Sequence, residues 1–299
     1  MDRLFQSGHI AKAYVLSRPH TPAFVKEKTL KYLKERMNQP NERFSLLLDI
    51  GCGSGQSTTI FTPHFERIIG VDPSENQIAA ARANNSASNV EYRVGISDNL
   101  PADPHSVDMV IVGQAIHWFD YEKFFKECER VLKPNGCLAA YGFGIPNVTA
   151  KVGDADEKQQ SESDRLIKKF TDDCHFDKNI ARLFDDYEGL FAEIPSKDKV
   201  RLSDLELVKE MSLEAFIAYI RSYSGYQNHV ADTVKEIVTE KQISEEAAMK
   251  IYSQEHDILK IMCEGIKRCW CIEGVEDSQV QLKVTWNVPL VMSRKIGVN

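Results

Sequence analysis

The chain contains 299 residues, with 37 Lys and Arg against 44 Asp and Glu, and therefore carries a net charge of −7. An acidic chain without a long basic stripe is a poor candidate for binding nucleic acid or an anionic membrane. With 42% hydrophobic and 27% charged residues, the composition excludes wholesale disorder and predicts two domains or one elaborated α/β domain.

Residues 45–144 predict strands that alternate with helices. Short apolar runs at 45–50, 67–72, 107–112 and 137–141 are typical of buried parallel strands, and residues 90–94 alternate as a fifth strand. Three helices are predicted between these strands. The first covers residues 57–65, and the second begins after Ser74, where Gln77 completes a capping box. The third covers residues 121–132 and is ended by the proline and glycine within residues 133–136. This order predicts an α/β fold with a doubly wound, mostly parallel sheet, in which ligands bind beyond the carboxyl ends of the strands.

Beyond residue 146 the pattern becomes mostly helical. Helices are predicted over 151–175, 213–226 and 230–270, and strands over 202–211 and 279–286. We interpret residues 1–40 as an N-terminal lid segment and residues 41–146 as the ligand-binding core. Residues 147–299 are interpreted as a helical cap over the binding crevice that also supplies the terminal strands of the same sheet.

The cysteines and the absence of long apolar runs predict a cytoplasmic protein. Seven cysteines show no regular spacing, the start of the chain has no apolar signal-like run, and no window approaches the ~18 apolar residues of a membrane span. Reduced thiols in the cytosol are the simplest interpretation. Cys263, Cys269 and Cys271 lie close to His256 in sequence but lack the paired spacing of a zinc site, so no metal site is predicted.

The most informative segment is a glycine-rich turn that follows the first predicted strand. Asp49 ends that strand, Gly51, Gly53 and Gly55 occupy every second position after it, and Asp72 ends the next strand. Glycines in such a turn let the backbone approach a bulky ligand and leave amides available at the next helix start. A carboxylate at the end of the second strand is placed to accept both hydroxyls of a ribose.

The same turn departs from the dinucleotide-binding pattern, because Gln56 stands where that pattern requires its third glycine. In addition, the carboxylate of Asp49 would repel a pyrophosphate. An adenosine ligand that carries an amino acid, without phosphates, therefore suits this site better.

Residues 48–144 resemble the class I S-adenosylmethionine-dependent methyltransferases. The Asp49-x-Gly51-x-Gly53-x-Gly55 run looks like their first motif, and Asp72 looks like their ribose-binding acid. Residues 95–101 look like their third motif, but Ile96 stands where the family carries an acid, so Ser97 or the neighbouring backbone is expected to contact the adenine. The resemblance implies S-adenosylmethionine as the cofactor.

A narrower resemblance links most of the chain to the trans-aconitate and cantharidin-type small-molecule methyltransferases, whose characterised members methylate carboxylates of small organic acids. It rests on residues 14–22, 115–120, 219–226 and 284–287. Tyr14, Arg18 and Gln114 are predicted to contact the cofactor, with Arg18 as a bidentate partner of a carboxylate. His117 and Arg221 are predicted to act on the acceptor, as hydrogen-bond donor and as clamp. The predicted lining of the acceptor pocket is Trp118, Tyr223 and Tyr226.

The leading hypothesis is O-methylation of a small organic acid. A carboxylate with a pKa near ~4 is ionised at neutral pH, so such an acceptor needs no general base. One alternative is methylation of a phenol, amine or thiol with His117 as base, and another is a cofactor-binding scaffold without turnover. No nucleic acid, membrane or obligate protein partner is predicted, and the identity of the acceptor and the oligomeric state stay open.

Overall fold

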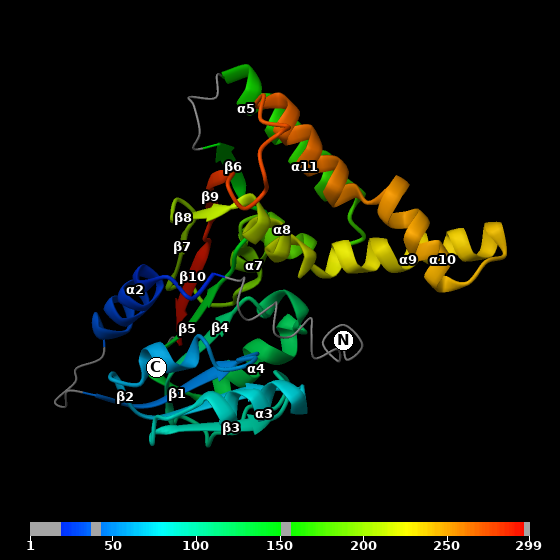
Figure 1. Ribbon diagram of the computed structural model, residues 1–299. Helices are drawn as coiled ribbons and strands as arrows, with labels where there is room; N and C mark the ends of the chain where they lie inside the picture. The colour runs from blue at the N-terminus through cyan, green and yellow to red at the C-terminus, as the bar shows by residue number, and fades with distance from the viewer. Residues whose placement is uncertain (1–18, 37–42, 151–156, 296–299) are drawn as a thin grey trace. The chain divides into compact units, whose positions relative to one another are not determined.

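The computed structural model describes residues 19–36, 43–150 and 157–295, which form two compact units (Figure 1). The sheet unit contains the described parts of Pro19–Gly144, Asn179–Leu207 and Asn287–Asn299. The helical unit contains the described parts of Ile145–Lys178 and Val208–Trp286. The division at residues 144 and 145 lies close to the predicted boundary at 146, but residues 179–207 and the end of the chain return to the sheet unit.

The sheet unit is built on a seven-stranded sheet with the order β3-β2-β1-β4-β5-β10-β7. Strands β1 to β5 pair in parallel, and β10 lies antiparallel between β5 and β7. The predicted α/β fold with a mostly parallel sheet is confirmed. Chain order reverses between β1 and β4, which makes the carboxyl ends of these two strands the expected ligand position. The strands are β1 (Phe44–Ile50), β2 (Phe65–Asp72), β3 (Val90–Val94), β4 (Val107–Gly113), β5 (Leu132–Tyr141), β7 (Lys199–Leu202) and β10 (Leu290–Arg294).

Two helices of the sheet unit, α3 (Glu75–Asn84) and α4 (Tyr121–Val131), begin at side-chain caps that the sequence carries. The hydroxyl of Ser74 accepts a hydrogen bond from the Gln77 amide at 3.4 Å, as predicted, and Asp120 caps the next helix in the same way. The helix predicted over 57–65 is wrong: only a short 3-10 turn forms, because its run of β-branched residues and Pro63 disfavour a longer helix. The helical elements are α2 (Ala23–Lys34), η1 (Thr58–Phe61), α3 (Glu75–Asn84), η2 (Ile116–Trp118), α4 (Tyr121–Val131), α6 (Ala181–Phe184) and α7 (Glu188–Glu193).

The main core of the sheet unit lies between the central strands and α4. Leu48 and Val110 from neighbouring strands and Phe124 from α4 are all inaccessible to solvent. The start of the β1–β4 strand pair is fixed by a buried carboxylate. Asp108 on β4 accepts the amides of Ser45 and Leu46 on β1 at 2.8 and 2.9 Å. These contacts set the register from which the ligand-binding ends of both strands follow.

The helical unit combines a three-stranded sheet, in the order β6-β9-β8, with a group of helices. Figure 1 shows α11 lying along α5, in agreement with the dense packing between these two helices. No helix in the described ranges is long and apolar enough to cross a membrane. The elements are β6 (Asn147–Ala150), α5 (Glu157–Asp173), β8 (Glu206–Ser212), α8 (Leu213–Arg221), α9 (Ser224–Lys241), α10 (Glu245–Ile251), the π-helix η3 (Tyr252–His256), α11 (Ile258–Cys269) and β9 (Gln281–Asn287).

Two predicted strands do not join the main sheet as expected. The strand predicted over 279–286 is β9, which pairs with β6 in the smaller sheet, with Val284 opposite Val148. Its burial alternates along the strand, as suits a sheet with one covered face, whereas β4 is buried almost throughout. The strand predicted over 202–211 is divided at the turn residues Ser203 and Asp204 into β7 and β8, which belong to different sheets.

The helix predicted over 213–226 is also interrupted. The hydroxyl of Ser222 donates to the Tyr219 carbonyl at 2.6 Å, and Tyr223 has an extended backbone. A serine hydroxyl that bonds the preceding turn competes with the helical ladder, and the chain continues as a separate helix, α9.

Candidate active site

The glycine-rich turn after β1 takes a backbone path that requires glycine. Gly51, Gly53 and Gly55 have φ angles of 72°, 53° and 83°, in the left-handed region. The amides of Gly51 and Cys52 donate to the Val71 carbonyl on β2, at 2.7 and 3.0 Å. The turn is therefore fixed against the neighbouring strand before any ligand arrives.

The three glycines differ in what a side chain would meet. A Cβ at Gly51 would collide with Ala115, and a Cβ at Gly55 would collide with the Tyr92 hydroxyl. At Gly53 the nearest atom to such a Cβ would be the Gln77 side-chain oxygen, 3.9 Å away. Gly51 and Gly55 thus serve internal packing, and Gly53 alone of the three leaves room for a ligand against the backbone.

Asp72 lies at the end of β2, beside Gly53. One carboxylate oxygen accepts the Gly53 amide at 3.0 Å, and the other accepts the Ser74 amide at 2.9 Å. Burial raises the pKa of Asp72, and these two amides lower it in part. A carboxylate has about four acceptor positions, so Asp72 retains positions for two ligand hydroxyls.

Asp49, at the end of β1, is fully buried and only half satisfied. Its Oδ2 accepts the hydroxyls of Ser57 at 3.0 Å and Thr58 at 2.7 Å. Its Oδ1 has no hydrogen-bond partner among the described residues, although no solvent reaches it. Burial raises the pKa of Asp49 to about 6, despite the two hydroxyl donors. A buried carboxylate oxygen without a donor is costly, and this marks a position where a cationic or hydrogen-bonding ligand group would be stabilised.

The loop after β4 packs against the glycine turn. Gln114 has a left-handed backbone with a φ of 60°, and its amide donates to the Tyr141 carbonyl on β5 at 2.9 Å. The next residue, Ala115, fills the space beside Gly51. His117 follows in η2 and is 3% exposed, with its ring centre 5.3 Å from that of the partly exposed Trp118. The loop that carries the predicted residues Gln114, His117 and Trp118 therefore packs against the glycine-rich turn through Ala115.

The predicted adenine-side segment follows β3. The Ser97 hydroxyl donates to the Asp98 carboxylate at 3.1 Å, and Asp98 also pairs with Lys123 at 3.4 Å. Ile96 is 54% exposed, so this edge presents an apolar side chain where the related enzymes carry an acid.

Sequence reasoning missed the side chains that support Asp49. The sequence pattern predicts Ser57 and Thr58 only as part of a helix, whereas both hydroxyls bond Asp49. The available signal was the spacing itself, because hydroxyl residues eight and nine positions after Asp49 follow the glycine turn directly.

Predicted residues of the helical unit have more varied surroundings. Arg221, predicted as the clamp for the acceptor, lies at the end of α8 and is exposed to solvent. Tyr223 is buried, and its hydroxyl donates to that of Tyr219 at 3.0 Å. Tyr226 is also buried and donates to Asp257 at 3.0 Å. The predicted cofactor contacts Tyr14 and Arg18 lie outside the described residues.

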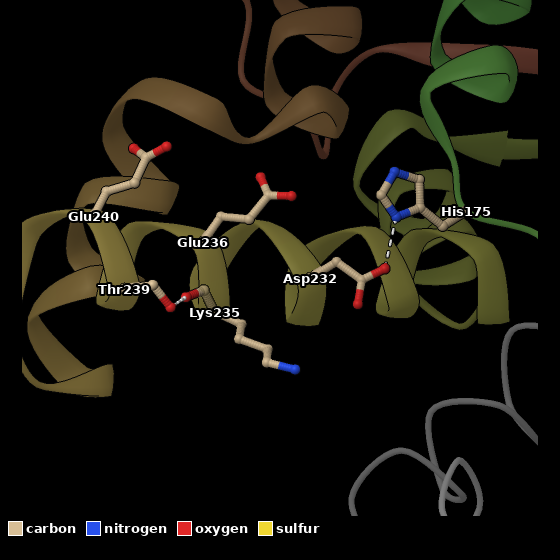
Figure 2. Close-up of a pocket in the computed structure, with 6 residues that line it drawn as sticks. All are labelled: His175, Asp232, Lys235, Glu236, Thr239 and Glu240. Carbon is tan, nitrogen blue, oxygen red and sulfur yellow. Dashed lines mark hydrogen bonds and ion pairs between the residues drawn. The ribbon is translucent and has the colours of Figure 1, made fainter.

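A separate open depression of about 470 Å³ lies along α9 in the helical unit. Figure 2 shows His175 and Asp232, which are 2.8 Å apart, at one end and two glutamates further along the helix. None of the predicted site residues lines it. Among the described residues, no group of three or more His, Cys, Asp or Glu side chains could hold a metal ion.

Comparison with known proteins identifies the chemistry of this site. Residues 48–140 match the methyltransferase domain family. A Dictyostelium discoideum protein named as a methyltransferase is 30% identical over 200 residues, which is 67% of this chain and 72% of that protein. A Saccharomyces cerevisiae protein named as an S-adenosylmethionine-dependent methyltransferase is 24% identical and covers 99% of this chain and 97% of its own length. This chain belongs to the S-adenosylmethionine-dependent methyltransferases.

The fold of this methyltransferase also occurs in solved structures. A type II methyltransferase structure from Anaeromyxobacter dehalogenans superimposes with a TM-score of 0.66, at 24% identity, over 94% of this chain and 99% of the other. The predicted cofactor, S-adenosylmethionine, is confirmed by the family.

The residues present fit this cofactor. Asp72 retains acceptor positions for ribose hydroxyls, Gly53 leaves room beside the backbone, and the unpartnered Oδ1 of Asp49 suits a cationic group. When bound, the cofactor supplies an electrophilic methyl group on a sulfonium. These residues would bind and align the cofactor, and alignment can supply roughly 7–11 kcal/mol of barrier reduction at best.

Proposed function

We propose that this methyltransferase O-methylates the carboxylate of a small organic acid, as members of the trans-aconitate and cantharidin-type subgroup do. The proposal includes His117 as hydrogen-bond donor and Arg221 as carboxylate clamp. Trp118, Tyr223 and Tyr226 are proposed for the acceptor pocket, and Tyr14, Arg18, Ser97 and Gln114 for the cofactor. It also includes a cytoplasmic location, with which the seven free cysteines are compatible.

The polar side chains of the loop after β4, residues 114–118, carry this proposal. Gln114 and His117 offer neutral or cationic polar groups beside the glycine turn. The nearby acids are already engaged, because Asp120 caps α4 and pairs with Lys123 at 3.2 Å, and Asp98 pairs with the same lysine. An anionic acceptor approaching this loop would therefore meet donors in place of competing carboxylates.

The chemistry of a carboxylate acceptor suits such a loop. A carboxylate oxygen forms the new C–O bond while the S–CH₃ bond breaks, and no proton has to move. A phenol, amine or thiol would first have to lose a proton, and His117 is the residue of this loop that could accept it. The position of His117 is the observation that favours this second candidate.

The decisive experiment incubates the enzyme with methyl-labelled cofactor and a panel of carboxylic acids, phenols, amines and thiols. Methyl esters release labelled methanol in alkali, whereas methyl ethers and methylamines do not. We expect alkali-labile product from acids only, at a rate that stays flat above pH 6 when the cofactor is saturating. A rate step near ~6.5, the ordinary histidine pKa, that is abolished in His117→Gln would instead support the second candidate.

Arg221 provides a matched pair of variants. Arg221→Ala should raise KM for an acid at least tenfold with little change in kcat, and Arg221→Lys should recover part of the loss, because the clamp acts through its charge. If the KM for the acid is the same in the wild type and in both variants, Arg221 does not bind the acceptor. Cofactor binding without transfer to any acceptor would support a scaffold and contradict the proposed reaction.

A further inference from the structure

The loop after β4, which carries Gln114, His117 and Trp118, is contacted at both ends by one later segment of the sheet unit. That segment, residues 180–187, contains α6 and leads into α7. The sequence predicts it as part of the cap, whereas the structure returns it to the sheet unit. Its contacts with the loop and with β5 join residues 63 and 46 positions apart.

At the start of the loop, two donors meet on one carbonyl oxygen of β5. The Gln114 amide donates to the Tyr141 carbonyl at 2.9 Å, and the hydroxyl of Tyr187 donates to the same oxygen at 3.4 Å. A carbonyl oxygen has two lone pairs and can accept both. Tyr187 is inaccessible to solvent, and its hydroxyl would lie 2.5 Å from a Cβ at Gly142. The missing side chain of Gly142 therefore lets Tyr187 reach this carbonyl.

At the end of the loop, Arg182 contacts two residues that follow Trp118. Its Nη1 donates to the Phe119 carbonyl at 3.3 Å, and its guanidinium carbon lies 4.5 Å from the centre of the Tyr121 ring. A guanidinium at this distance over an aromatic ring is attracted to it. Arg182 is exposed, so these contacts hold the end of the loop without filling the core.

The backbone on both sides of the Tyr141 carbonyl is in an unfavourable conformation. Asp186 and Tyr187 have φ angles of 52° and 60°, and Gln114 has a φ of 60°. Non-glycine residues persist in the left-handed region where surrounding contacts impose it, and such residues gather at functional sites. Arg201 on β7 supplies one of these contacts, because its Nη1 donates to the Asp186 carbonyl at 3.3 Å.

We propose that Arg182 and Tyr187 are positioning residues that fix the loop after β4 against the glycine-rich turn. Ala115, between the two held ends, fills the space beside Gly51, so a displaced loop would alter the turn to which the cofactor binds. Both side chains act through the loop. The inference rests on the proposed role of this loop at the cofactor, and it is independent of which acceptor is methylated.

Trp118 provides a spectroscopic readout of the loop. The chain contains three tryptophans, of which Trp118 is partly exposed, whereas Trp270 and Trp286 are buried in the helical unit. In protein labelled with fluorotryptophan, fluorine NMR gives one resonance for each ring. The variant Trp118→Phe identifies the resonance that comes from the loop.

The test compares the wild type with Arg182→Ala, Arg182→Lys and Tyr187→Phe. In Arg182→Ala we expect the Trp118 resonance to shift or broaden and the Kd of S-adenosylmethionine, measured by calorimetry, to rise about three- to tenfold. Arg182→Lys should recover part of this loss, because an ammonium can still donate to the Phe119 carbonyl. Tyr187→Phe removes one longer hydrogen bond and should raise Kd about two- to threefold.

Two variants of the same unit serve as matched controls. Arg43→Ala removes another exposed arginine whose side chain donates to backbone carbonyls, those of Thr62 at 2.6 Å and Pro63 at 3.2 Å. Tyr32→Phe removes another buried hydroxyl that donates to a backbone carbonyl, that of Asp198 at 3.0 Å. Both should leave the Trp118 resonance and the Kd unchanged.

The proposal requires both readouts to move in Arg182→Ala. If the Trp118 resonance or the Kd stays at its wild-type value, the proposal is overturned, even where the melting temperature falls. Equal changes in Arg43→Ala would also contradict it. Because Arg182 is exposed, its two variants keep the test valid should Tyr187→Phe fail to fold. Neither readout uses an acceptor, so the result is separate from the outcome of the acceptor panel.

Discussion

Buried polar side chains occur both at Asp49, beside the glycine-rich turn of the sheet unit, and in the helical unit, where Tyr219, Tyr223 and Trp286 form a cluster. The two regions differ in whether every buried polar atom has a hydrogen-bond partner. In the helical unit, Tyr219 accepts from both Tyr223, at 3.0 Å, and the Trp286 indole, at 2.9 Å. In the sheet unit, one carboxylate oxygen of Asp49 accepts hydrogen bonds from two hydroxyls, and the other oxygen has no donor among the described residues.

This difference separates a structural cluster from a binding site. A polar network whose members bond one another stabilises a single packing arrangement, and a ligand adds little to it. A buried carboxylate with an unpartnered oxygen costs stability in the free protein and regains it when a donor binds. We therefore propose Asp49 as a cofactor contact and a packing role for the hydroxyl of Tyr219.

The largest expected effect concerns the glycines. Gly55→Ala should destabilise the protein by about 2–5 kcal/mol, from the left-handed φ and the clash with Tyr92. Gly53→Ala has no such clash and should cost only about 1–2 kcal/mol of stability, while weakening cofactor binding. Urea unfolding and cofactor titration of both variants check this, and equal stability losses would contradict the packing role of Gly55.

Asp49 should make the free protein less stable as pH rises. Its folded pKa of about 6 lies above the ordinary 3.8, so the native state binds the proton more tightly. The protonated carboxyl of Asp49 makes its full contribution to stability below pH 4. That contribution, about 3 kcal/mol for a pKa raised by about two pH units, is lost as the pH rises through 6. The wild type and Asp49→Asn should therefore differ in the slope of unfolding free energy between pH 4 and 7. If the wild type and Asp49→Asn have the same slope, Asp49 does not titrate between pH 4 and 7.

Asp72, at the end of β2, allows a second test of the proposed cofactor site. Asp72→Ala removes the predicted ribose acceptor and should raise the Kd of S-adenosylmethionine about 10- to 100-fold, the range expected for charge-assisted hydrogen bonds. Glu91→Gln is the control, because Glu91 is an exposed carboxylate of the same unit that pairs with Arg67 and Arg93. Unchanged affinity in Asp72→Ala would exclude Asp72 from the cofactor site.

The smallest effect is expected in the helical unit. Tyr219→Phe leaves the Trp286 indole without its acceptor and should lower the unfolding free energy by about 1–3 kcal/mol. Cofactor affinity in this variant should equal that of the wild type. A tenfold loss of affinity with unchanged stability would reverse the assignment of this cluster.

Much of the sheet unit was predictable because local signals and tertiary structure agree there. The strand at 90–94 and the cap at Ser74 are confirmed, since the alternation of apolar and polar side chains and side-chain capping both depend on neighbouring residues. The C-terminal half was harder to predict. The strand β10 was missed, and β9 was assigned to the wrong sheet, because strand pairing between distant segments has no local signature.

The sequence by itself determined the parallel core, the glycine turn and the pair of carboxylates that end β1 and β2, because each follows from spacing along one short segment. Tertiary structure alone decided that the Ser57 and Thr58 hydroxyls donate to the same oxygen of Asp49, and that the other oxygen is left without a described donor. Hydrogen-bond satisfaction depends on three-dimensional proximity between residues that are distant in sequence, as between the Gly53 amide and Asp72, 19 positions apart, and no local pattern records it.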